Sequence, residues 1–174
     1  QHERRGPRLL VELRVGLLRD SLQAVHANRY EMRTAVFINA LAEGLNDLRQ
    51  HAAALAAIDE AIALVESQGG YLNMPESLRI KGEILASTPG ADPQLAQQCL
   101  LDALQWSHDQ AALSWELRAA SSLARLRLKQ GRVEAARQVL APVYGRFTEG
   151  HDTADLVVAR NLLENMDQLQ PAMR

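Results

Sequence analysis

Apolar residues recur every three or four positions in the long segments of this chain, which is the spacing of one face of an α-helix. The clearest case is the segment 52–67, where the acidic residues fall on the other side of the helical wheel. Its apolar stripe consists of Leu55, Ile58, Ile62 and Val65. The same spacing predicts further helices over residues 8–27 and 111–129. The stripe of the first of these consists of Leu10, Leu13, Leu17 and Leu18.

Helix-breaking residues separate these periodic segments. Gly69 and Gly70 end one helix, and Asp92 followed by Pro93 has the form of an N-cap and an early-turn proline. Gly131 predicts a tight turn between two later helices. No segment alternates apolar and polar residues as a strand would. We therefore expect an all-α protein with about seven helices.

Small residues recur with a long period along the chain. Ala42, Gly82 and Ala124 are separated by 40 and 42 positions. After each of them the chain presents a small residue, a large apolar residue four positions later, and a smaller apolar residue three positions after that. The three sets are Ala54, Ile58 and Ala61; Ala96, Leu100 and Ala103; and Ala136, Leu140 and Val143. Small side chains let two helices approach to about 8–9 Å, so the pattern predicts closely packed antiparallel hairpins.

This order of small and large residues resembles the tetratricopeptide repeat. The period is longer than the roughly 34 residues of that family, and Lys81 stands where a large apolar residue is expected. The resemblance implies a tetratricopeptide-like superhelix of antiparallel helical hairpins in a single domain, 1–174. We expect the segments of that domain to be a disordered terminus (1–7), a lead helix (8–28), repeat 1 (31–69), repeat 2 (75–109), repeat 3 (111–147) and a capping helix (152–168).

The carboxyl half carries a narrower resemblance. The motifs are residues 113–120 (LSWELRAA), 122–126 (SLARL), 130–132 (QGR), 134–137 (EAAR), 140–144 (LAPVY), 146–150 (RFTEG) and 152–156 (DTADL). Together they resemble the carboxyl-terminal repeat region of bacterial signal-transduction ATPases, in which a winged-helix transcriptional regulator domain or a class III cyclase domain precedes the ATPase. The resemblance implies a regulatory module, with ATP bound elsewhere in a larger parent protein and no cofactor in this chain.

Charge and cysteine content narrow the partners and the location. Lysine and arginine number 19 against 21 aspartate and glutamate residues, so no broad positive field is available for nucleic acid. No apolar run reaches the roughly 18 residues needed to span a membrane. Cys99 is the single cysteine, which fits a reducing, cytoplasmic setting. The chain begins at Gln1 with a helix that has no expected partner before it, so we expect a fragment of a larger protein.

The sequence gives no pattern typical of catalysis or metal binding. Ser107, His108 and Asp109 are consecutive, and consecutive helical residues point about 100° apart, so they cannot form a hydrogen-bonded triad. No two of the five histidines are three or four residues apart, as two metal ligands on one helix would be. We therefore expect no enzyme activity and no metal in this chain.

A binding surface follows from the register of the repeat. The first helices of such hairpins line a concave inner wall, and their polar positions are expected to be exposed there. These candidate residues are Asn39, Glu43, Asn46, Arg79, Glu83, Arg118, Ser121 and Arg125. Their mixed charges favour a polar peptide or protein domain as partner, including the ATPase domain of the same chain; an ordinary solvated face is the alternative. Trp106 and Trp115 either pack between hairpins or line a surface that contacts a ligand.

Two further functions remain open at this stage. A pocket between hairpins would make the chain a small-molecule sensor. Alternatively, the stripe of Leu10, Leu13 and Leu17 would make the lead helix a self-association element that forms a homodimer. The leading hypothesis is a regulatory module that binds other proteins.

Overall fold

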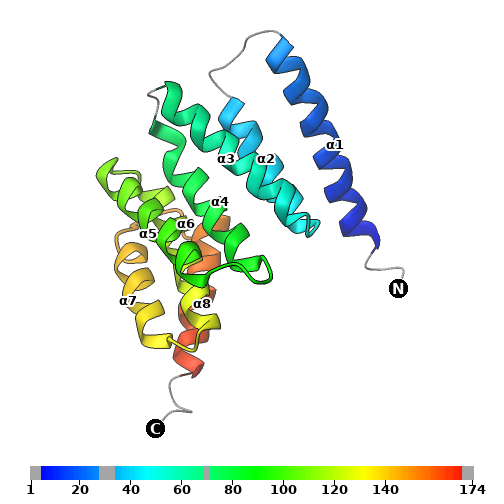
Figure 1. Cartoon of the computed structure of the whole chain (residues 1–174). Helices are drawn as coiled ribbons and strands as arrows, with labels where there is room; N and C mark the ends of the chain where they lie inside the picture. The colour runs from blue at the N-terminus through cyan, green and yellow to red at the C-terminus, as the bar shows by residue number, and fades with distance from the viewer. Residues whose placement is uncertain (1–4, 28–33, 69–70, 170–174) are drawn as a thin grey trace.

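The computed structural model describes residues 5–27, 34–68 and 71–169, and the regular structure in these ranges is entirely helical. Eight α-helices and a short 3₁₀ helix are described (Figure 1). They are α1 (Arg5–Ala27), α2 (Thr34–Asp47), α3 (His51–Gln68), η2 (Tyr71–Asn73), α4 (Met74–Ser87), α5 (Pro93–Asp109), α6 (Leu113–Lys129), α7 (Val133–Tyr144) and α8 (Ala154–Leu169). The prediction of an all-α fold is confirmed.

The predicted number of about seven helices is one too small. The described ranges contain the predicted lead helix, three pairs and capping helix in the predicted order, with one helix more than the approximate number expected. The disordered terminus expected at 1–7 is also corrected in part. Helix α1 begins at Arg5 and includes Pro7, because a proline is tolerated in the first helical turn where its missing N–H has no partner to lose. Residues 1–4 lie outside the described ranges.

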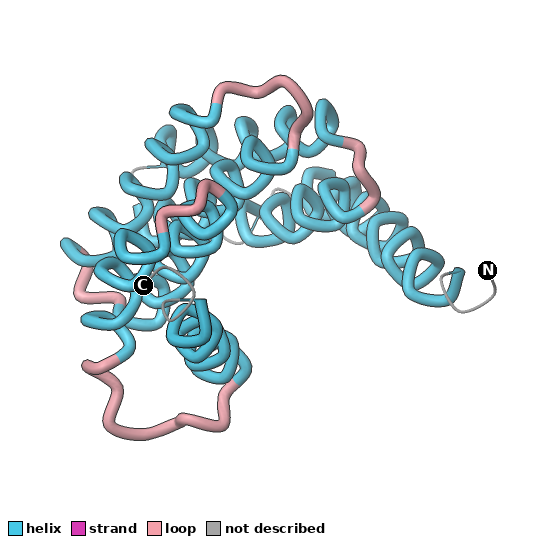
Figure 2. Tube along the Cα trace, turned by 90° about the horizontal axis from the view of Figure 1, so that it is seen from below, coloured by secondary structure: helices cyan, strands magenta, loops and turns pink. Residues whose placement is uncertain are grey.

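The helices form hairpins stacked in two layers. Helix α2 packs against α3, α4 against α5, and α6 against α7. Helices α2, α4, α6 and α8 also pack each against the next, and so form one continuous layer. Helices α3, α5 and α7 lie on the other side of this layer, and the whole stack follows an arc (Figure 2).

The small residues of the repeat lie where the helices approach most closely. Ala42 and Ala124 are completely buried, and a Cβ added to Gly82 would stand 2.7 Å from Cγ of Leu100 and 3.1 Å from the carbonyl oxygen of Ala96. The predicted residues of the second helices of the hairpins are also buried. They are Ala54, Ile58, Ala61, Ala96, Leu100, Ala103, Ala136, Leu140 and Val143. The period read from the sequence therefore identifies the tight contacts of the fold.

The same backbone turn ends three of the helices. Arg49, Ala111 and Gly131 have φ values of 62°, 53° and 72° and follow α2, α5 and α6. In each turn the amide of the next residue donates to the carbonyl five positions earlier, as in Arg132 N to Arg127 O at 2.9 Å. This is the Schellman arrangement, which requires a left-handed residue after the helix. The predicted turn at Gly131 is confirmed, and only there is the left-handed residue a glycine.

The start of α5 follows the sequence prediction, and the start of α4 is built in another way. Asp92 accepts a hydrogen bond from the amide of Gln94 at 2.8 Å, and Pro93 occupies the first turn. Asn73 precedes α4 but makes no capping hydrogen bond with its side chain; its carbonyl instead accepts from the Ser77 hydroxyl.

The apolar stripe predicted for the lead helix faces away from the stack. Leu10, Leu13 and Leu17 are 57–67% exposed and Leu18 is partly buried, whereas Val15 and Leu22 are buried in the apolar cluster that α1 forms with its neighbour α2. The reason lies in Gly44 of α2, where a Cβ would come within 2.8 Å of the Val15 side chain. Because α2 has no side chain at this position, the branched Val15 fits closely against its backbone. The register of α1 is therefore set by this contact, and Leu10, Leu13 and Leu17 are left exposed.

Among the helices that the structure describes, none is both long enough and apolar enough to cross a lipid bilayer.

Candidate polar site on the inner layer

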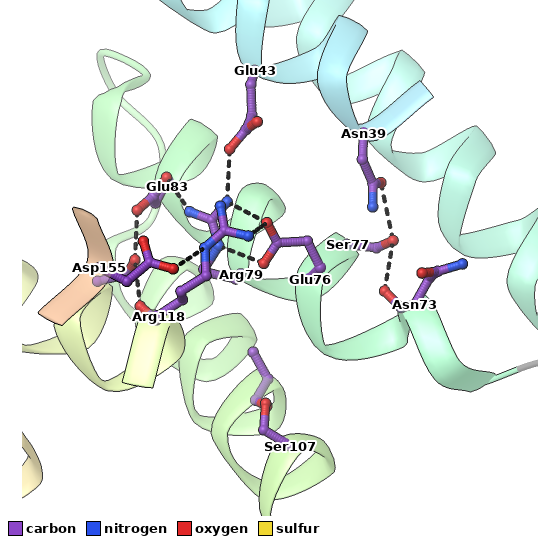
Figure 3. A network of polar contacts seen from close by, with 12 residues as sticks. Asn39, Glu43, Asn73, Glu76, Ser77, Arg79, Glu83, Ser107, Arg118 and Asp155 are labelled. Carbon is purple, nitrogen blue, oxygen red and sulfur yellow. Dashed lines mark hydrogen bonds and ion pairs between the residues drawn. The ribbon is translucent and has the colours of Figure 1, made fainter. Parts of the chain in front are cut away.

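The layer formed by α2, α4, α6 and α8 is called the inner layer below. A series of charged and polar side chains crosses it from α2 to α8 (Figure 3). Its members project from the polar sides of four helices that lie next to one another. They are Asn39 and Glu43 on α2; Glu76, Ser77, Arg79 and Glu83 on α4; Arg118, Ser121, Ser122 and Arg125 on α6; and Asp155 on α8. We call this set the inner polar network.

Arg79 is the centre of the inner polar network. Its side chain is 6% exposed, and all three guanidinium nitrogens contact carboxylates. Nε donates to Glu76 at 2.8 Å, Nη2 donates to Glu43 at 2.6 Å and to Glu76 at 2.9 Å, and Nη1 lies 2.7 Å from Glu83. Burial acts to lower the pKa of Arg79, but the hydrogen bond with Glu76 and the negative charges of Glu83, Glu76 and Glu43 outweigh it and raise that pKa above its ordinary value. Arg79 is therefore a permanent charge that ties α2 to α4.

The network continues from α4 to α6 and α8. Nη1 of Arg118 lies 2.6 Å from Glu76, and its Nε lies 3.9 Å from Asp155. The Ser122 hydroxyl donates to Glu83 at 2.5 Å, and Arg125 lies 3.6 Å from the same carboxylate. Four carboxylates and three guanidinium groups thus share the inner layer, which leaves one net negative charge on the network.

A pocket of about 210 Å³ opens between α4, α6 and α8. It is lined by Arg79, Glu83, Arg118, Ser121, Ser122, Arg125, Asp155 and Val158. All but Val158 are polar or charged. Arg118 and Arg125 keep 34% and 42% of their side chains exposed, so their guanidinium groups remain accessible from the pocket.

The structure brings most of the predicted binding residues together but does not expose all of them. Asn39, Arg79 and Ser121 are only about 5% exposed, which corrects the expectation that they are open to a partner. The cause is the small spacing between successive inner helices: Asn39 accepts the Ser77 hydroxyl at 3.0 Å, across the contact of α2 with α4. Glu43, Glu83, Arg118 and Arg125 are partly exposed.

Asn46 lies apart from the pocket. Its side-chain oxygen accepts the Ser87 hydroxyl at 2.7 Å and is 3.1 Å from Nδ1 of His51. It therefore links α2 to the end of α4 and to the start of α3, rather than lining the pocket.

Four residues belong to the site but were absent from the predicted set: Glu76, Ser77, Ser122 and Asp155. Glu76 could have been found, because it stands three residues before Arg79 on the same helix face. The sequence marks Asp155 only as an acidic residue in the first turn of a helix. Its approach to Arg118 depends on how α8 packs on α6. A single helical wheel carries no such information.

The residues considered for catalysis have other partners. The Ser107 hydroxyl is buried and donates to the Ala103 carbonyl at 2.7 Å. Nδ1 of His108 lies 3.4 Å from Glu116, which also receives both hydrogen bonds from Nη1 of Arg146. In the described ranges, no three or more His, Cys, Asp or Glu side chains gather as metal ligands would.

Comparison of the chain with protein-family models, with curated proteins and with solved structures found no match.

Proposed function

We propose that this chain is a regulatory protein-interaction module and that it binds a polar segment of another protein at the pocket of the inner layer. The supporting observation is the different state of its three arginines. Arg79 is buried and has all its nitrogens engaged by carboxylates, whereas Arg118 and Arg125 are accessible from the pocket. Arg118 pairs closely with Glu76 through Nη1 at 2.6 Å, but its Nε lies 3.9 Å from Asp155, and Arg125 lies 3.6 Å from Glu83. Guanidinium groups held in place but incompletely paired are well suited to contact a partner.

The size of the pocket favours a side chain of a partner protein over a free metabolite. Pockets for small-molecule ligands are generally about 300–1,000 Å³. The volume here is about 210 Å³, and the lining is almost entirely polar. A carboxylate, amide or hydroxyl side chain of a bound segment fits these dimensions. At this inner pocket, the sensor function expected as an alternative therefore has less support than protein binding.

The wider setting of the proposal comes from the sequence resemblance. On the basis of this resemblance, we propose that the chain is the repeat region of a larger bacterial ATP-binding transcriptional regulator or signalling protein in the cytoplasm. The partner is then either the ATPase domain of the same chain or a separate protein. The inner layer would convey the presence of a partner to the rest of the parent protein.

A peptide selection tests this function. Peptides are selected from a random library against the immobilised chain, and their dissociation constants are then measured by calorimetry for the wild type and for Arg118→Ala/Arg125→Ala. We expect the double variant to bind at least about fivefold more weakly, which corresponds to roughly 1 kcal/mol. Its melting temperature should change little, since both side chains are more than one third exposed and Glu76 keeps its two hydrogen bonds from Arg79 when Arg118 is removed.

The matched control is Arg19→Ala/Arg160→Ala, which removes two exposed arginines from α1 and α8 outside the pocket. It should bind the selected peptides as the wild type does. Peptides that bind equally to both double variants and to the wild type would rule out the inner pocket as the recognition site.

Self-association is a second candidate, favoured by the exposed leucines of α1. Leu9, Leu10, Leu13 and Leu17 lie on the side of α1 that does not contact α2 and are each more than half exposed. Sedimentation of the chain over a range of concentrations tests it. A dimer that Leu13→Gln/Leu17→Gln converts to a monomer would support this function, and a monomeric wild type at high concentration would exclude it.

A further inference from the structure

A second pocket lies on the opposite side of α4 from the inner polar network. It is lined by Ile62 and Glu66 of α3, Tyr71 of η2, Met74 and Leu78 of α4, and Asp102, Gln105 and Trp106 of α5. On α4, Met74 and Leu78 face this pocket while Arg79 faces the inner layer. Its volume is about 460 Å³, and more of its surface is apolar than polar. We call it the outer groove, because its lining includes residues of α3 and α5, two helices of the layer opposite α2, α4, α6 and α8.

The apolar part of the outer groove contains a pair of stacked aromatic rings. The centroids of Tyr71 and Trp106 are 5.3 Å apart and their planes differ by 19°. Trp106 packs beside the buried Val65 and Met74, whereas Tyr71 is 43% exposed. Gln110 donates to the Tyr71 carbonyl at 2.8 Å and so holds η2 against the end of α5. The rings therefore form a fixed wall of the groove with an accessible edge.

The charges around the outer groove are predominantly negative. Glu66 and Asp102 line it from opposite sides. Asp59 lies two turns before Glu66 on α3 and pairs with Lys81 at 2.7 Å. These three carboxylates and one ammonium group leave two net negative charges. The groove lies near the carboxyl ends of α3 and α5, whose dipoles add negative potential, and beside the amino end of α4 at Met74, whose dipole opposes them, so the net negative charge comes from the side chains.

We propose that the outer groove binds a basic amphipathic helix of a partner protein. In this arrangement apolar side chains of the partner pack on Tyr71, Trp106 and Leu78, and a lysine or arginine reaches Glu66 and Asp102. Charge complementarity selects this partner over an acidic one, and the apolar wall selects an amphipathic segment over a merely cationic one. Lys81 provides an internal precedent, because it is a cation of α4 that pairs with Asp59 of α3, although neither residue lines the groove. The inference is independent of the function proposed for the inner layer.

A pair of designed peptides tests this inference on the whole chain. One is a helical peptide about 14 residues long with leucines on one face and lysines beside them, and the other carries glutamate in place of each lysine. Fluorescence anisotropy of the labelled peptides gives their dissociation constants. We expect the lysine peptide to bind the wild type and the glutamate peptide to bind at least about tenfold more weakly. Failure of the lysine peptide to bind at millimolar protein would overturn the proposal.

Two pairs of variants locate the binding. Glu66→Gln/Asp102→Asn should weaken the lysine peptide at least about fivefold, whereas Glu60→Gln/Glu149→Gln, which removes two exposed carboxylates outside the groove, should leave it within about twofold. Tyr71→Ser should also weaken it, while Leu72→Ser, at the adjacent and more exposed position, should not. Equal weakening by both double variants would mean general charge attraction and would overturn the proposal. So would a dimer of the chain alone that Glu66→Gln/Asp102→Asn dissociates, because the groove would then hold a second copy.

Discussion

Gly82 of α4 and Leu100 of α5 are in direct contact, with the Leu100 side chain occupying the space that a Cβ on Gly82 would need. The distance from that Cβ position to Cγ of Leu100 is 2.7 Å, and the backbone carbonyl of Ala96 limits movement on the other side. The α4–α5 hairpin therefore depends on the absence of a side chain at this position. The contact is an instance of the close approach that small residues allow between helices.

Gly82→Ala should destabilise the chain by about 1–3 kcal/mol, and Gly82→Leu by more, because Leu100 and the α5 backbone must shift to admit the added atoms. Urea unfolding followed by circular dichroism measures the difference. The control is Gly16→Ala in α1, where an added Cβ meets nothing within 4 Å. It should be neutral or stabilise by up to about 1 kcal/mol through helix propensity. A Gly82→Ala variant as stable as the wild type would contradict this account of the hairpin.

These close contacts could be predicted from the sequence because they repeat. Three small residues at a period of about forty, each followed by a second set at a fixed offset, have few explanations other than hairpins packed in the same way each time. The structure buries all of them. The periodicity was informative because the small residues occupy the same close contact between paired helices in each repeat.

The lead helix shows where the helical pattern alone fails. Two apolar stripes run along α1, and the leucine stripe is the more hydrophobic by composition. The structure nevertheless buries Val15 and Leu22, with Val11 and Leu18 partly buried beside them. The choice is made by Gly44, which lies on another helix. A pattern within one segment cannot reveal which of two faces fits its neighbour.

The inner polar network was predictable in composition but not in pairing. The sequence register placed Glu43, Arg79, Glu83, Arg118 and Arg125 on one wall, and the structure agrees. The sequence register could not show that all three guanidinium nitrogens of Arg79 would contact carboxylates while Arg118 and Arg125 stay accessible. That distinction depends on how far each pair of inner helices is offset along the stack.

Ala111 supports a prediction about the turn between α5 and α6. It has a φ of 53° in the position that Gly131 occupies in the next turn, and its side chain is exposed. A left-handed conformation costs an L-residue about 1 kcal/mol or more, so Ala111→Gly should stabilise the chain by up to about 1 kcal/mol. Thermal unfolding measures the gain. The reverse change, Gly131→Ala, should lower stability by a similar amount. A loss of stability in Ala111→Gly, or a gain in Gly131→Ala, would contradict the interpretation.

Arg79→Ala should destabilise the chain by about 3 kcal/mol. The variant leaves Glu43, Glu76 and Glu83 close together without the cation that compensates them, and two of these carboxylates are one third exposed or less. Arg79→Lys should recover only part of the loss, since one ammonium group cannot make the three separate contacts of the guanidinium. Urea unfolding at neutral pH gives the values.

Arg160→Ala is the control for this experiment, because Arg160 lies 4.0 Å from Glu164 on the exposed side of α8. Such surface pairs contribute about 0–1 kcal/mol, so little change is expected. If Arg79→Ala cost no more than Arg160→Ala, the inner polar network would not hold α2 to α4, and its carboxylates would have to be solvated independently.

Arg146 ties the segment after α7 to the start of α6. Its Nη1 donates to both carboxylate oxygens of Glu116, at 2.7 Å and 2.6 Å, and the Glu116 side chain is only 7% exposed. Arg146→Ala should cost about 2–3 kcal/mol by leaving a buried carboxylate with only His108 beside it.

The measurement that distinguishes a local from a global effect of Arg146→Ala is amide hydrogen exchange. Protection should fall in the first turns of α6 and in the connection before α8, and remain unchanged in α2 and α3, which do not contact this pair. Arg8→Ala, which removes an exposed pair with Glu12, should leave exchange at α6 as in the wild type. Uniform loss of protection along the chain would instead mean that the α6–α8 end does not unfold separately from the rest.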